Sequence, residues 1–152
     1  MTNNKASDGP RKQIIRDCPE CKGLPFSVVL KSLSYDAWDK RLVVTVIDEH
    51  GGQQQEYNIA FPKGLLAFRV MDESHFLTWQ SELCTDHPPN SAVSEVQNSA
   101  YLEWFVQSEG QIHYRAEDLR HIEIVTPDDC VDVIIHADAE VHFREAPKPM
   151  SP

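Results

Sequence analysis

The sequence predicts an α+β domain with a bent, mainly antiparallel sheet, open or partly closed into a barrel, and two helices between the strands. Three observations support this fold class. Several segments alternate apolar and polar residues, the period of two that a half-buried strand shows. Two of these segments flank a glycine turn, as in a β-hairpin. Two other segments carry apolar residues at helical spacing after residues that can cap a helix.

Four strands are expected in the first half of the chain. Residues 26–35 mix β-branched and aromatic side chains. Residues 41–49 and 55–61 alternate apolar and polar positions on either side of a His-Gly-Gly turn, so we expect them to pair as a hairpin. Residues 65–72 follow a Pro-Lys-Gly break and form the fourth expected strand.

Two helices are expected in the middle of the chain. The first lies within residues 72–84, which carry a short apolar stripe. The second lies within residues 98–110, between a cap at Asn98 or Ser99 and a stop at Gly110. Its apolar side chains share one face of the helix: Leu102, Phe105 and Val106.

The last third of the chain returns to strands. Residues 121–136 are expected to form two strands around a Pro-Asp-Asp turn, and residues 140–144 are expected to add an edge strand. On the second strand, one face carries Val131, Val133 and Ile135. The other face carries Cys130, Asp132, Ile134 and His136.

The length of 152 residues is that of about one domain. We expect a disordered tail over residues 1–13, a single domain over residues 14–144 and a second tail over residues 145–152, which are rich in proline. No apolar run is long enough to cross a bilayer, and residues 1–13 lack the apolar stretch of a secretory signal. The expected location is therefore cytoplasmic.

The formal net charge of −10 limits the partners of this chain. An acidic surface repels phosphate backbones, and no basic patch opposes it, so we expect no nucleic-acid binding. The same charge attracts a basic protein partner. The sequence does not indicate an oligomeric state.

Two short segments suggest a zinc site. Residues 18–23 read CPECKG, a Cys-x-x-Cys turn in which a glycine can follow the second cysteine with positive φ. Residues 84–87 read CTDH and could complete the tetrahedral set. The expected ligands are Cys18, Cys21, Cys84 and His87. Such a full shell would be structural, since it leaves no open position for catalysis.

The same cysteines permit two other interpretations. A redox motif needs its first cysteine at a helix N-terminus, and Gly23 and Pro25 argue against a helix there. Alternatively, Cys18 and Cys21 lie on an exposed loop and Cys84 ends a helix, without any metal.

Other residues with catalytic chemistry form no specific motif. A Cys, His and acid face on the last hairpin would bring together His121, Glu123, Cys130, Asp132 and His136. Such a face could serve an enzyme but is also typical of the polar side of a sheet. The sequence has no phosphate-binding loop, dinucleotide fingerprint or nucleophile elbow. Trp38, Trp79 and Trp104 are expected in the core, and an exposed one would mark a partner site.

Two segments carry a resemblance to a known class of proteins. LLAFRVMDES at residues 65–74 and HIEIVTPDDCVDVI at residues 121–134 resemble segments of small bacterial cytosolic proteins of the polymorphic-toxin immunity type. The resemblance implies a non-catalytic protein that occludes a basic partner. The alternatives are a small zinc-stabilised domain and an enzyme that uses the face around Cys130.

Overall fold

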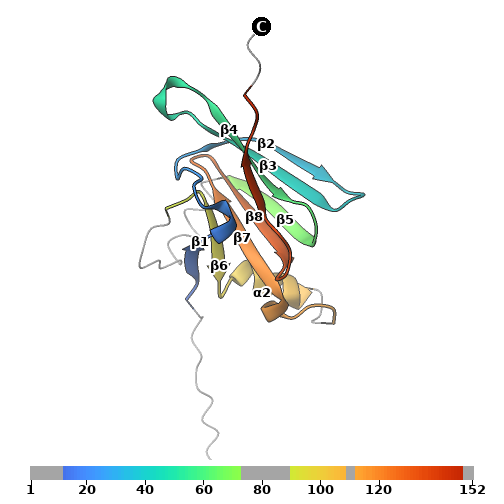
Figure 1. Cartoon of the computed structure of the whole chain (residues 1–152). Coiled ribbons are helices and arrows are strands. Elements are labelled where there is room, and N and C mark those ends of the chain that lie inside the picture. The colour runs from blue at the N-terminus through green and yellow to red at the C-terminus, as the bar shows by residue number, and fades with distance from the viewer. Residues whose placement is uncertain (1–11, 73–89, 109–111, 149–152) are drawn as a thin grey trace, which may run out of the picture.

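The computed structural model describes residues 12–72, 90–108 and 112–148 of the chain. Within these residues, two antiparallel sheets face each other, and α2 (Ala100–Ser108) lies against the outer face of one of them (Figure 1). The strands are β1 Ile14–Asp17, β2 Val29–Asp36, β3 Arg41–Asp48, β4 Gln55–Phe61, β5 Leu65–Asp72, β6 Val93–Gln97, β7 Leu119–Val125, β8 Asp129–His136 and β9 His142–Glu145. Three short 3-10 turns join them: η1 Pro19–Cys21, η2 His50–Gly52 and η3 Ala116–Asp118.

The strand order confirms the α+β class and the antiparallel pairing. It corrects the expectation that the sheet could be partly closed into a barrel. The five-stranded sheet has the order β1-β6-β7-β8-β5, and the four-stranded sheet has the order β2-β3-β4-β9. The described strands thus form two separate open sheets and no closed barrel. The predicted hairpin is confirmed as β3 and β4, in which Val44 pairs with Ile59. Alternation fixes which face of a strand is buried, but not whether a sheet closes on itself.

The predicted number of helices is only partly confirmed. The helix expected within residues 98–110 is α2, the one α-helix in the described ranges. Ser99 is its cap, since its Oγ accepts the backbone N–H of Leu102 at 3.0 Å. The helix expected within residues 72–84 falls almost wholly on residues outside the described ranges.

Two hydrophobic clusters hold the elements together. The larger fills the space between the sheets, where Val131, Val133 and Ile135 of β8 meet Val44 and Ile59 of the other sheet. The smaller lies on the opposite face of β8, where Ile134 is covered by buried residues of α2. Strand β8 is therefore buried on both faces, which explains its nearly continuous run of apolar residues.

Two strands were not predicted. β1 and β6 pair with each other in antiparallel register, with Ile15 opposite Val96. Both are short, and β1 is an edge strand with mostly exposed side chains, so neither shows a strong alternating pattern. Gln13, which directly precedes β1, is buried, and its side-chain Oε1 accepts the N–H of Ala100 at 2.9 Å.

We predict that Ile124→Ala lowers the free energy of unfolding by about 2–5 kcal/mol, because it leaves a cavity between the sheets. Ile112 is a matched control, since 77% of this side chain is exposed. Ile112→Ala should change stability by less than about 0.5 kcal/mol. Denaturant unfolding measures both, and equal losses would contradict the assignment of the core.

Candidate functional site

A row of polar residues crosses the outer face of the five-stranded sheet beside α2. Register places Ser94 of β6 opposite Glu123 of β7, Glu123 opposite Asp132 of β8, and Asp132 opposite Arg69 of β5. We call these four residues the outer polar row. Ser94, Glu123 and Asp132 are buried, so the row places ionisable groups where water does not solvate them.

Asp132 is the centre of the row. Its Oδ2 accepts a hydrogen bond from Arg69 Nε at 2.7 Å, and its Oδ1 lies 2.8 Å from His121 Nε2. Burial raises the pKa of a carboxyl, but the hydrogen bond and charge of His121 and those of Arg69 outweigh it, so the pKa of Asp132 is lowered. The carboxylate therefore stays ionised, and it connects β8 with β5 and β7.

His121 extends this chain of hydrogen bonds to α2. Its Nδ1 lies 2.7 Å from Ser99 Oγ, the oxygen that caps the helix. The order Ser99, His121, Asp132 has the connectivity of a hydrolase triad, but Asp132 is on Nε2 and the serine on Nδ1. Ser99 Oγ is buried and already accepts the N–H of Leu102. These contacts attach the start of α2 to the sheet.

Aromatic rings cover one end of the row. The guanidinium of Arg69 lies 3.9 Å from the ring centroid of Tyr101, and the edge of His121 meets the same ring at 5.4 Å. Trp104 also stacks on Tyr101, with ring centroids 5.9 Å apart. Trp104 is 59% exposed, so a surface ring is connected through Tyr101 to the buried charges.

Glu123 and Cys130 form the other end of the cluster. The Cys130 thiol donates to Glu123 Oε1 at 3.5 Å. Burial, followed by the charge of Asp132, raises the pKa of Glu123 to about 7, and burial also raises the pKa of the Cys130 thiol. One ligand atom from each of Glu123, Cys130 and Asp132 lies within 4.8 Å of the others, so this group could bind a metal ion.

The predicted face of the last hairpin is therefore brought together in part. Four of its residues are buried neighbours: His121, Glu123, Cys130 and Asp132. His136 lies at the end of β8 instead, with its ring 5.8 Å from that of Tyr114. Arg69 and Ser99 were not predicted. Polar residues within the apolar run of β8 are the signal that could have indicated a buried cluster with partners elsewhere.

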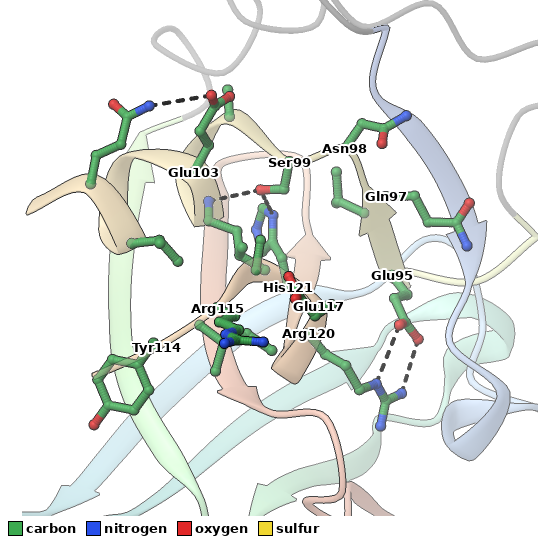
Figure 2. A pocket seen from close by; sticks show the side chains of 17 residues that line it. Glu95, Gln97, Asn98, Ser99, Glu103, Tyr114, Arg115, Glu117, Arg120 and His121 are labelled. Atoms are coloured by element: carbon green, nitrogen blue, oxygen red, sulfur yellow. Dashed lines mark hydrogen bonds and ion pairs between the residues drawn. The ribbon is translucent and has the colours of Figure 1, made fainter. Parts of the chain in front are cut away.

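A groove of about 1090 Å³ lies beside this cluster, between α2, β6 and the segment that contains η3 (Figure 2). Ser99 and His121 line it. The carboxylates of Glu95, Glu103 and Glu117 and the guanidinium groups of Arg115 and Arg120 also line it. Because charges of both signs are present, the groove does not select strongly for a charged ligand of one sign.

Cys18 and Cys21 are buried, which corrects the expectation of an exposed loop. The N–H of Cys21 bonds to the carbonyl of Cys18 at 3.1 Å, and Cys18 N–H bonds to Val93 O. Gly23 has a φ of +99°, as the predicted turn requires. The hydrogen bond with Cys21, followed by burial, raises the pKa of Cys18. The other two expected ligands, Cys84 and His87, lie outside the described residues.

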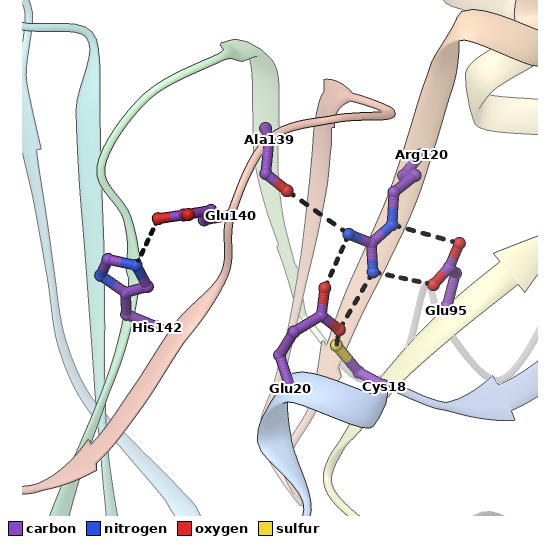
Figure 3. Close-up of polar contacts among 7 residues, drawn as sticks. All are labelled: Cys18, Glu20, Glu95, Arg120, Ala139, Glu140 and His142. Atoms are coloured by element: carbon purple, nitrogen blue, oxygen red, sulfur yellow. Dashed lines mark hydrogen bonds and ion pairs between the residues drawn. The ribbon is translucent and has the colours of Figure 1, made fainter.

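An arginine fixes this cysteine turn to the five-stranded sheet (Figure 3). Arg120 of β7 binds Glu20 through Nη1 at 2.8 Å and Glu95 of β6 through Nη2 at 3.0 Å. The pKa of Glu20 is lowered to about 2, chiefly by the hydrogen bond from Arg120. Cys18 Sγ also lies 3.2 Å from Glu20 Oε2. The turn is therefore held by the carboxylate of Glu20 and by the burial of its two cysteines.

The expectation that the tryptophans lie in the core is wrong for two of them. Trp38 is 93% exposed, at the turn between β2 and β3, and Trp104 is also largely exposed. An aromatic residue contributes to a core only where the surrounding chain can cover it, and a turn of the hairpin offers no such cover. Trp79 lies outside the described residues.

Comparisons of the chain with protein-family models, with curated proteins and with solved structures found no match. No helix in the described ranges is long and apolar enough to span a membrane.

We predict that Asp132→Asn lowers the free energy of unfolding by about 3–5 kcal/mol, because Arg69 and His121 lose their shared carboxylate while the fold keeps them in place. Asp138→Asn, on the exposed turn after β8, is the matched control and should cost less than about 0.5 kcal/mol. Denaturant unfolding at neutral pH compares them. A cost for Asp132→Asn no larger than that of the control would show that the buried pair contributes nothing.

Proposed function

We propose that this protein acts by binding a basic protein partner and not by catalysis, with Trp38 as an anchor of the interface. The main observation that supports this proposal is the exposure of Trp38, whose side chain is 93% accessible on a turn at the end of a hairpin. A tryptophan buries roughly 150–250 Å² when it is covered, and tryptophan is enriched among the residues that dominate binding energy.

The turn that carries Trp38 is already ordered. One oxygen of Asp36, Oδ1, accepts the backbone N–H of Trp38 at 2.9 Å and that of Asp39 at 3.1 Å. The N–H of Asp39, followed by that of Trp38, lowers the pKa of Asp36, so the acceptor is ionised at neutral pH. Because the backbone is fixed before binding, a partner that covers Trp38 loses less affinity to ordering.

Further apolar groups adjoin the edge strand β5 next to this hairpin. Tyr35, three residues before Trp38, packs on Phe68 of β5 with ring centroids 5.1 Å apart. Val70 of β5 and Trp104, stacked over Tyr101, are also exposed. An edge strand with exposed aromatic groups on both sides is suited to a protein partner.

The charge of the chain gives the expected chemistry of that partner. A formal net charge of −10 at pH 7 produces a field that draws in positively charged proteins and repels nucleic acids. The sharpest form of this proposal is an immunity-like role, in which the partner is a basic toxin. It rests on the resemblance of residues 65–74 and 121–134, which include all of β5 and most of β7 and β8.

We predict that Trp38→Ala weakens partner binding about 30-fold or more, the effect of losing an interface anchor. Wild-type and variant chains would be immobilised and exposed to extract of the source cells. Mass spectrometry would then identify basic proteins that only the wild type retains. With the purified partner, the association rate should fall as salt is raised, because attraction between opposite charges is screened.

Phe26→Ala provides the matched control, since Phe26 is an exposed aromatic residue before β2, at the other end of that strand from Trp38. This variant should bind as the wild type does. Equal affinity of the Trp38→Ala and wild-type chains, or an association rate insensitive to salt, would reject the proposed interface.

A second candidate role is that of a zinc-stabilised domain, with the expected ligands Cys18, Cys21, Cys84 and His87. The observation in its favour is the closed turn of Cys18 and Cys21, in which both thiols are buried and Gly23 has positive φ. The N–H of Asn90 also donates to Asp17 Oδ1 at 2.9 Å, so the chain returns to the residue before Cys18. His87 precedes Asn90 by three positions in the sequence, a reach of about 10 Å.

For this second role, we predict that the Cys18 site of the purified, untagged protein holds about one zinc per chain, so Cys18→Ser should contain about one zinc fewer than the wild type. The melting temperature should then fall markedly, because metal binding contributes to the free energy of folding. Elemental mass spectrometry and thermal unfolding measure these effects. Unchanged zinc content and melting temperature in Cys18→Ser would leave Cys18 and Cys21 as core residues alone.

A further inference from the structure

Beyond partner binding, we propose that Glu123, Cys130 and Asp132 form a buried site for a divalent transition metal, with zinc as the best-suited ion. This site lies on the outer face of the five-stranded sheet, away from the cysteine turn at η1. Two adjacent strands supply all three residues, so the rigid β7–β8 hairpin fixes their relative positions.

The geometry brings the three ligand atoms close together. Glu123 and Asp132 are paired across β7 and β8, and Cys130 precedes Asp132 by two residues, on the same face of β8. One donor atom of each residue lies within 4.8 Å of the other two. Three protein donors leave a fourth tetrahedral position for water or another group.

An independent observation indicates that a ligand is missing from the contacts of Glu123. This side chain is 97% buried, since only 3% of it is accessible, and its Oε1 receives the Cys130 thiol. Its Oε2 is buried and has no hydrogen-bond partner among the described residues. A buried carboxylate oxygen without a partner is costly, and coordination of a cation would satisfy it.

The surroundings of Asp132 are compatible with this role. Each carboxylate oxygen has two lone-pair positions, so the bonds from Arg69 Nε and His121 Nε2 leave further positions for a metal. Carboxylate ligands in metal sites are commonly oriented by hydrogen bonds of this kind. Arg69 and His121 therefore hold the carboxylate of Asp132 in a fixed orientation.

Charge selects a divalent ion. When Cys130 gives up its proton to solvent and its sulfur bonds to the metal, the two carboxylates and the thiolate carry three negative charges. Arg69 supplies one positive charge beside Asp132. For these four side chains, a divalent cation brings the net charge to zero, which a monovalent ion does not. A thiolate with carboxylates favours zinc or cobalt over magnesium or calcium, which prefer oxygen ligands alone.

The test uses the full chain, freed of metal by chelation and titrated with Co²⁺ and then with Zn²⁺. Thiolate bound to Co²⁺ gives a charge-transfer absorption band, which Zn²⁺ should displace. In Cys130→Ser this band should lose the contribution of one thiolate, and elemental analysis should show one metal fewer per chain. In Glu123→Gln, which keeps the shape of the side chain, metal affinity should fall more than about 10-fold.

Cys18→Ser provides the control for the other cysteine pair, and it should retain the metal assigned to Cys130. Far-ultraviolet circular dichroism of each metal-free variant verifies the fold. Wild-type stoichiometry and affinity in both Cys130→Ser and Glu123→Gln would overturn the proposal, as would bound metal that is lost only in Cys18→Ser. Neither outcome bears on Trp38, so the partner-binding proposal stands or falls separately.

Discussion

The arrangement of the five-stranded sheet and its helix depends on the hydrogen bonds of the Asp132 carboxylate. It receives Arg69 from the edge strand β5 and His121 from β7, and through His121 it reaches Ser99 at the start of α2. A buried charge of this kind adds little net stability compared with apolar packing. It fixes the relative positions of its partners instead, because each partner has only one position in which all of these bonds are made.

The opposite side of the same sheet is closed by a different kind of contact. There, Arg120 joins Glu95 of β6 to Glu20 of the cysteine turn, while Cys18 and Cys21 complete the core between the sheets. The two faces of β7 therefore make different contacts. Its inner side anchors the N-terminal segment, and its outer side carries His121 and Glu123, which connect to the helix and to the proposed metal position.

The local sequence pattern correctly predicted the elements whose contacts join residues close together in the sequence. The β3–β4 hairpin and the alternation of β8 follow from period two, and the start of α2 follows from Ser99. Contacts across long separations could not be predicted this way: the strand β1 needs β6, and Arg69 is 63 residues from Asp132. Trp38 was wrongly predicted to lie in the core, because a single sequence does not show whether an aromatic side chain lies in a core or at an interface.

The hydrogen bond between Ser99 and His121 also implies an order of folding steps. The buried partner of the helix cap exists only once β7 is paired with β8, since His121 is itself positioned by Asp132 across that hairpin. The described part of helix α2 has nine residues, and a helix of that length is too short to persist in isolation. Docking of α2 should therefore be a late step of folding, and pulsed hydrogen exchange should show the amides of β7 and β8 protected before those of α2.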